Sequence, residues 1–110
     1  MKYYVDKKEV TGIPMEGHVT YKLLNEDNGC IAGCCTGISV YTTTEYPTAN
    51  FHEDQEGFVV LEGTGWAKIG DQEFKFEPEM SFLAPAGVRH SIKREPNSSP
   101  VKVFWFHSAV

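Results

Sequence analysis

The feature that most constrains the fold of this chain is the short spacing of its turn signals. Clusters of Gly, Pro, Asn, Asp and Ser recur at residues 26–29, 63–65, 70–72, 85–87 and 96–100. Between them lie short runs rich in β-branched and aromatic residues, at 19–24, 38–44, 57–61, 66–69, 74–76, 81–83, 90–93 and 101–107. Apolar residues do not repeat at helical spacing over three turns, so the pattern predicts an all-β sandwich or barrel.

The first of these turns predicts a hairpin. Residues 26–29 end in Asn28-Gly29, a dipeptide typical of hairpin turns because both residues tolerate a positive φ. We therefore expect residues 19–24 to pair with a run that starts at Cys30.

Length and charge exclude several classes of partner. The 110 residues include 10 Lys and Arg against 15 Asp and Glu, a formal net charge of −5, and no polybasic block. Nucleic acids and anionic membrane surfaces are bound by clustered basic residues, so neither is expected as a partner. The chain has no linker and no internal repeat, which predicts a single domain over residues 1–110.

The cysteines and the apolar runs bear on the compartment. No apolar run approaches the roughly 18 residues of a membrane span, and the N-terminus has no hydrophobic signal segment. Cys30, Cys34 and Cys35 are an odd number, which fits a reducing cytoplasm better than a disulfide framework. Their spacing lacks the second ligand pair of a zinc site, so we interpret them as small core residues in a cytoplasmic protein.

Two predicted strands are apolar on both faces. In residues 57–61 and 103–106 the alternation of a half-exposed strand is missing. One face can fill the interior of a barrel, and the other must be covered by a second sheet or by another subunit. We expect a homodimer.

Three residues near strand ends have the chemistry of metal ligands. His52 lies four residues before Glu56, which begins an apolar strand, and a Pro85-Ala86-Gly87 turn precedes His90. Two imidazoles and one carboxylate that converge inside a barrel form a facial triad with open positions. Such a set binds one divalent transition metal, and iron, manganese, zinc, nickel and copper all suit it.

These residues carry a resemblance to the cupins. Asn50, His52, Glu56 and Gly63 resemble the first cupin motif, and Pro85, Gly87 and His90 resemble the second. The resemblance covers about residues 30–107 and implies a double-stranded β-helix, or jelly-roll barrel. It implies the metal ligands His52, Glu56 and His90.

The chain also departs from the family pattern. Asn50 stands where cupins usually have their first histidine, which makes it a weaker fourth ligand because an amide oxygen holds transition metals less well than imidazole. Thr44 and Glu79 replace the glycines that usually open the two motifs, and Arg94 replaces a late asparagine. By strand alternation Arg94 shares the face of His90, where it would bind an anionic group of a substrate or form an ion pair.

Other interpretations of the histidines stay open. His52 and Asp54 also spell the His-x-Asp of oxoglutarate-dependent oxygenases, with His107 as a distant third ligand, although those enzymes have longer chains. His107 itself shares a strand face with Trp105, and is either a polar group at the barrel mouth or a surface residue. His18 is interpreted as a structural or surface histidine.

Two classes of function follow from the resemblance. The first is a small metalloenzyme, such as a dioxygenase, isomerase or decarboxylase, acting on a small polar or anionic molecule. The second is a non-catalytic module that binds a ligand or a carbohydrate. Cupin barrels host both, so the fold alone does not separate them.

Overall fold

The chain folds as an all-β protein. The computed structural model describes residues 1–108, and these form nine β-strands and two short 3-10 helices. The strands are β1 (Ile13–Met15), β2 (His18–Lys22), β3 (Cys35–Tyr41), β4 (Gln55–Glu62), β5 (Gly65–Ile69), β6 (Gln72–Phe76), β7 (Ser81–Ala84), β8 (His90–Arg94) and β9 (Val101–Ser108). The helices are η1 (Lys7–Glu9) and η2 (Glu26–Asn28). The predicted fold class is confirmed.

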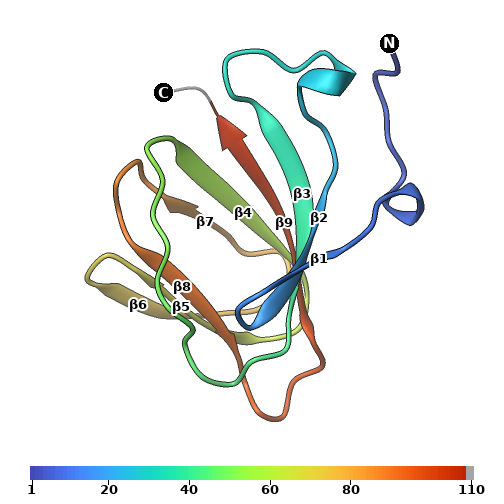
Figure 1. The fold of residues 1–110 in the computed structure, drawn as a ribbon. Coiled ribbons are helices and arrows are strands. Elements are labelled where there is room, and N and C mark those ends of the chain that lie inside the picture. The colour runs from blue at the N-terminus through green and yellow to red at the C-terminus, as the bar shows by residue number, and fades with distance from the viewer. Residues whose placement is uncertain (109–110) are drawn as a thin grey trace.

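The strands form two antiparallel sheets that face each other. The larger sheet has the order β1-β2-β3-β9-β4-β7, and the smaller has the order β6-β5-β8. Figure 1 shows the smaller sheet lying below the larger one. Non-consecutive neighbours such as β3, β9 and β4 are typical of a jelly roll, in which distant segments of the chain pair.

The core lies between the two sheets and follows the alternation of the strands. In β9, Val101, Val103 and Trp105 point inward and are buried, whereas Lys102 and Phe104 between them are only partly buried. The other strands contribute buried residues in the same way: Tyr41, Phe58, Val60, Ala67, Ile69, Phe76, Ala84 and Ile92. Apolar residues at every second position therefore fill the space between the sheets.

One glycine lets a tryptophan lie across the larger sheet. Gly37 of β3 is the direct cross-strand partner of Trp105 of β9. A Cβ atom at position 37 would lie 2.1 Å from Cζ2 of the indole, a distance that van der Waals contact forbids. Gly37 thus creates the space in which the Trp105 ring is held.

The predicted hairpin forms, but its turn differs from the expectation. β2 and β3 pair antiparallel, and the loop between them spans residues 23–34. The Asn25 side chain caps η2, and Gly29, with φ of 98°, ends it. The Asn-Gly dipeptide therefore terminates a helical turn, and the second strand begins at Cys35 rather than at Cys30.

Within residues 1–108 no helix has both the length and the apolar character needed to cross a bilayer. The thiols of Cys30, Cys34 and Cys35 are free. None of the three is buried and Cys34 is exposed, so the interpretation of all three as core residues is wrong; Cys35 alone packs against the core. In the same part of the chain, none of the residue groups that could hold a metal ion includes a cysteine.

Candidate metal centre

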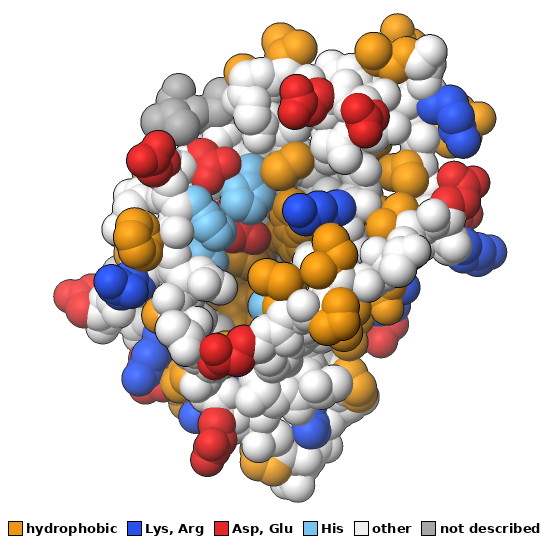
Figure 2. Space-filling model, in the orientation of Figure 1, with side chains coloured by type: hydrophobic (Ala, Val, Ile, Leu, Met, Phe, Trp, Pro, Cys, Tyr) orange, Lys and Arg blue, Asp and Glu red, His pale blue; other side chains and the backbone are white. Residues whose placement is uncertain are grey.

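A cavity of about 250 Å³ opens between the two sheets. Figure 2 shows it as a hollow in which histidine and acidic side chains are visible, with hydrophobic and basic side chains at its rim. Its lining combines the histidine cluster described below with hydroxyl groups of the larger sheet. The polar residues of the lining include Thr20, Lys22, Ser39, Asn50, His52, Glu56, His90 and His107.

The two loops that carry the predicted ligands are tied together by backbone hydrogen bonds. The Asn50 and His90 backbones donate to each other's carbonyl oxygens, over 3.0 and 2.8 Å, as an isolated antiparallel bridge. The Gly87 N–H donates to the carbonyl oxygen of His52 over 2.7 Å. These bonds place the loop before β4 against the turn before β8, and so bring His52 next to His90.

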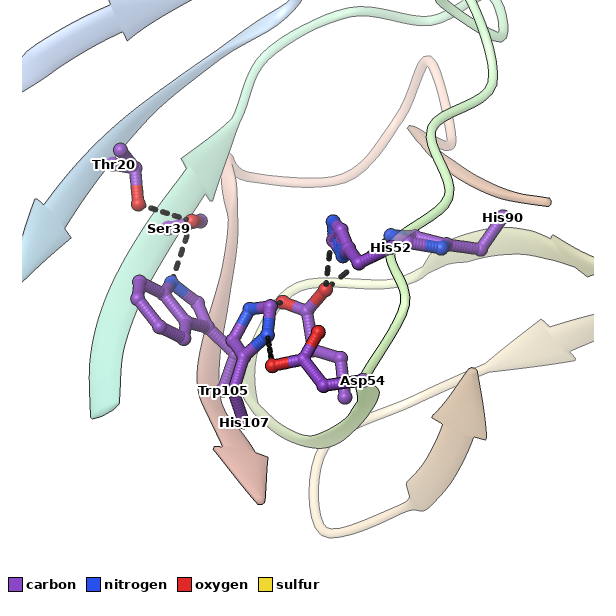
Figure 3. Close-up of polar contacts among 8 residues, drawn as sticks. Thr20, Ser39, His52, Asp54, His90, Trp105 and His107 are labelled. Carbon is purple, nitrogen blue, oxygen red and sulfur yellow. Dashed lines mark hydrogen bonds and ion pairs between the residues drawn. The ribbon is translucent and has the colours of Figure 1, made fainter. Parts of the chain in front are cut away.

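The Glu56 carboxylate lies at the centre of the cluster. Its Oε1 is 3.4 Å from Nε2 of His90 and 3.8 Å from Nε2 of His52. Its Oε2 is 3.6 Å from Nε2 of His107. Figure 3 shows the imidazoles of His52 and His90 together on one side of the cluster and the imidazole of His107 on the other side. Glu56 is buried, at 7% exposure, so its charge is largely removed from water.

His107 is held in one orientation by Asp54. Its Nδ1 lies 2.9 Å from Oδ2 of Asp54, which is a short hydrogen bond. A carboxylate only accepts, so Nδ1 carries the proton and the lone pair of Nε2 is directed at Glu56. A carboxylate that holds the far nitrogen of an imidazole is a common arrangement for histidines that bind metals.

The other two imidazoles are less firmly supported. Nδ1 of His90 is buried and has no hydrogen-bond partner among the described residues. The side chain of His52 is 32% exposed, and its ring lies edge-on to that of His90, with centroids 5.0 Å apart. Solvent and small molecules therefore reach the cluster from the side of His52.

The donor set fits a transition metal. Nitrogen and oxygen ligands about 2.1 Å from an ion lie roughly 3.0 to 3.4 Å apart, close to the separations around Glu56. Because the His107 lone pair faces an oxygen of Glu56, a cation between these two acceptors satisfies both. Two groups of three residues share His52, and within each group the ligand atoms lie within 4.8 Å of one another. The first is His52, Glu56 and His90, and the second is His52, Asp54 and His107.

The second set corresponds to the His-x-Asp alternative. The structure brings its three residues together, but the 2.9 Å bond makes Asp54 a partner of His107 Nδ1. Glu56 instead faces Nε2 atoms alone. The arrangement favours Glu56 as the carboxylate at the centre, with Asp54 orienting His107.

Asn50 and Arg94 have different placements. Asn50 borders the same cavity as the ligand cluster. Arg94 lies four residues beyond His90, about 13 Å along an extended strand. Its guanidinium donates to the carbonyl oxygens of Thr42 at 3.0 Å and Ser98 at 2.8 Å, with weaker bonds to two neighbouring carbonyls. Among the described residues that line the cavity Arg94 does not appear, so its placement gives no support to a role in substrate binding.

His18 of β2 also borders the cavity. Its ring stacks on Tyr41 with centroids 4.4 Å apart, and its Nδ1 contacts the carbonyl oxygen of Glu16 at 3.1 Å. Burial lowers the pKa of His18, although the Glu16 bond and the charge of Glu56 act in the opposite direction. Burial also raises the pKa of Tyr41, and the Glu56 carboxylate adds to this. Both side chains are therefore uncharged at neutral pH.

The ligand set expected from the cupin resemblance leaves out Asp54 and His107, which the sequence offered only through the His-x-Asp alternative. His107 is 53 positions from Asp54, and no spacing rule relates them. The usable signal is the alternation His52, Asp54, Glu56, which places three ligand-type residues at every second position. A polar residue in the inward phase of β9, after Val103 and Trp105, is the matching signal for His107.

Comparison with known proteins agrees with this architecture. The family model described as "Cupin domain" matches residues 39–107, which include all the residues of the centre. No curated protein sequence matches the chain.

Solved structures share the fold at low sequence identity. Hydroxypropylphosphonic acid epoxidase from S. wedmorenis is 16% identical, with a TM-score of 0.80 over 96% of this chain and 58% of its own. The polyketide cyclase RemF from Streptomyces resistomycificus is 18% identical, with a TM-score of 0.77 over 97% of this chain and 80% of its own. The Cnp3 cupin domain of Schizosaccharomyces pombe is 13% identical, with a TM-score of 0.73 over 89% and 65%.

The chain spans less than two thirds of the epoxidase and of the Cnp3 domain, so these likenesses concern the fold alone. The match of the family model covers well over half of the 110 residues. Its range contains both ligand-bearing motifs and the strands that position them. This chain belongs to the cupin domain family.

Proposed function

We propose that this chain is a metal-binding cupin that uses one divalent transition metal to bind or transform a small molecule. The ion is held by His52, Glu56 and His90. His107 supplies a fourth ligand nitrogen. The observation that carries the proposal is that three imidazole Nε2 atoms lie within 3.4 to 3.8 Å of one buried carboxylate.

Three imidazoles and one carboxylate suit iron, manganese, zinc, nickel or copper. Such an ion supplies a Lewis acid or an oxygen-binding centre when bound. Glu56 lowers the net charge of the site by one. The epoxidase with the same fold has been crystallised in an iron(II) form, which makes iron one of the metals to test first.

The cavity selects a small ligand. Its volume of about 250 Å³ is below the 300 to 1,000 Å³ typical of sites for drug-sized molecules. The exposed side of His52 leads into it, so a molecule enters beside the ligand cluster. Asn50 also lines this cavity, and as a shorter side chain it leaves the space that the first motif histidine would occupy. We infer a metalloenzyme of the dioxygenase, isomerase or decarboxylase type with a small polar or anionic substrate.

Metal titration of the purified, metal-free chain tests the proposal. His52→Ala, Glu56→Ala and His90→Ala are each expected to lose stoichiometric binding, because each removes a ligand. His18→Gln is the matched control, since it removes a cavity imidazole outside the cluster. Full retention of metal in all three variants would contradict the ligand assignment. Loss of metal binding in the His18 variant alone would place the metal site at His18 instead.

The outer face of the larger sheet supports a second part of the proposal, a homodimer. Phe104 lies in cross-strand register between Ile38 and Val59, and Phe106 and Leu83 are 37% and 46% exposed. The smaller sheet packs on the inner face and leaves these side chains uncovered. A contiguous apolar sheet face of this kind is typical of an interface between subunits.

Light scattering after size exclusion tests the dimer. The expected mass is about twice the 12.3 kDa of one chain. Phe106→Glu should give a monomer, whereas Phe51→Glu, at an aromatic ring that is 55% exposed in a loop, should not. A native monomer at micromolar concentration would contradict this part of the proposal.

A further inference from the structure

A hydrogen-bonded chain of three side chains runs along the wall of the cavity beside the metal centre. Trp105 Nε1 donates to Ser39 Oγ over 3.0 Å, and Ser39 Oγ donates to Thr20 Oγ1 over 3.0 Å. All three side chains are buried and line the cavity. Figure 3 shows Trp105 next to His107, with Ser39 and Thr20 extending away from the centre.

This chain of hydrogen bonds has one proton to spare. The indole N–H only donates, and each hydroxyl has one proton, so three protons are available for two bonds. In the observed direction the Thr20 hydroxyl proton is left over, and it has no acceptor among the described residues. If the Ser39–Thr20 bond runs the other way, the Ser39 proton is left over instead. Buried donors in native proteins are usually paired with protein or with water, so this wall offers a free donor to an acceptor atom in the cavity.

A positive charge lies next to this donor. Lys22 is two residues beyond Thr20 on β2, so both side chains are on the same face of the sheet. Lys22 borders the cavity and is the one Lys or Arg among its described lining residues. Figure 2 shows a basic side chain at the rim of the hollow. The lysines that form ion pairs within residues 1–108 are Lys2, Lys75 and Lys102, which leaves Lys22 without a carboxylate partner there.

The charges of the cavity favour an anion. Glu56 is the one carboxylate among its described lining residues. With a divalent ion bound as proposed above, the charges of the ion, Glu56 and the nearby Asp54 sum to zero, and Lys22 gives the cavity a net charge of +1. His18 and Tyr41 add no charge at neutral pH, because burial lowers the pKa of the first and raises that of the second.

We propose that Thr20, Ser39 and Lys22 form a binding site for the oxyanion group of a small organic ligand. The hydroxyl donates a hydrogen bond to one oxygen of this group, and the ammonium of Lys22 balances its charge. The rest of the ligand extends along the cavity toward the centre at Glu56. The proposal deepens the proposed function, since it names the chemical class of the molecule that the centre receives.

Calorimetric titration of the zinc-loaded and the metal-free chain tests the site, with succinate and inorganic phosphate as anions and glucose as a neutral probe. At least one anion is expected to bind, and glucose is not. Thr20→Val removes the hydroxyl at nearly constant volume and should weaken anion binding about 5- to 10-fold. Lys22→Gln should weaken it at least about 5-fold and reduce its dependence on salt. Lys8→Gln, at an exposed position outside the cavity, is the matched control.

The outcomes separate this site from the metal centre. Thr20→Val and Lys22→Gln should keep the zinc affinity of the native chain, whereas His52→Ala should lose it. A chain that binds no zinc but still binds an anion through Lys22 would contradict the proposed function and support the oxyanion site. Anion binding that is equal in the native chain and in both wall variants would overturn the site. Glucose binding that depends on Thr20, without anion binding, would overturn it as well. Preference for succinate or for phosphate shows whether the group is a carboxylate or a phosphoryl group.

Discussion

Glu56 and His107 are direct cross-strand partners on β4 and β9, and their side chains meet with Oε2 and Nε2 3.6 Å apart. Their pairing depends on the register between two strands that are distant in sequence and adjacent in the sheet. It joins the first motif to the last strand of the barrel. It also gives the centre a fourth candidate ligand without the histidine that Asn50 replaces.

Asp54 should affect metal affinity without touching the ion. In Asp54→Asn the partner of His107 Nδ1 becomes an amide, which no longer fixes the tautomer that directs the Nε2 lone pair at Glu56. We expect metal affinity to fall about 10- to 100-fold, measured by competition with a chelator. Glu53→Gln, at the exposed neighbouring carboxylate, is the control and should bind as the native chain does. Equal affinity in the Asp54 and Glu53 variants would remove His107 from the ligand set.

Asn50 should accept the motif histidine. Asn50→His adds an imidazole beside the cluster at a position whose backbone is bridged to His90. We expect metal binding to tighten by about 1 to 3 kcal/mol, roughly 5- to 150-fold, with the fold unchanged by circular dichroism. An unchanged affinity would place residue 50 outside the ligand shell. A weaker affinity would mean that the native site depends on the amide itself.

Gly37 should be intolerant of any side chain. In Gly37→Ala the new methyl group overlaps the Trp105 ring, so either the indole or β3 must move. We expect a loss of about 2 to 4 kcal/mol in the free energy of unfolding, measured with urea. The control is Gly33→Asn, where nothing lies within 4 Å of the added atom and the positive φ suits asparagine. Similar free energies of unfolding in the two variants would show that β3 and the Trp105 ring can shift at little energetic cost.

His18 should make the metal-free fold less stable in acid. Burial lowers its pKa in the folded chain below the ordinary value of about 6.5 that it has when unfolded. The unfolded chain therefore binds more protons at mildly acidic pH, and the contribution of His18 is present above pH about 6.5 and lost as the pH falls. NMR titration should give a midpoint below 6.5, and His18→Gln should flatten this part of the stability profile. A midpoint above 6.5 would contradict the prediction.

Local patterns in the sequence were enough for the fold class and for part of the centre. Short runs of β-branched and aromatic residues, such as residues 101–107, lie between turn signals and indicate strands, and the spacing from His52 to Glu56 is a local property of one strand and its preceding loop. The turn at Gly29 differs from the predicted hairpin turn. An Asn-Gly dipeptide can also end a short helix, and here it ends η2, whose N-terminus is capped by Asn25.

Features that depend on register between distant strands could not be predicted. The bond from His107 to Asp54 and the one from Trp105 to Ser39 each join residues more than 50 positions apart. Arg94 shows the limit of alternation. It indicates a face, but the distance along β8 carries the guanidinium past the cavity to backbone carbonyls such as that of Ser98.

Anomalous diffraction from crystals of the zinc-loaded chain tests the central claim most directly. We predict one strong peak within about 2.3 Å of the Nε2 atoms of His52 and His90 and of a carboxylate oxygen of Glu56, with His107 Nε2 completing the set. A peak at Cys30, Cys34 and Cys35 instead, or a fully loaded protein with no peak beside Glu56, would contradict the account.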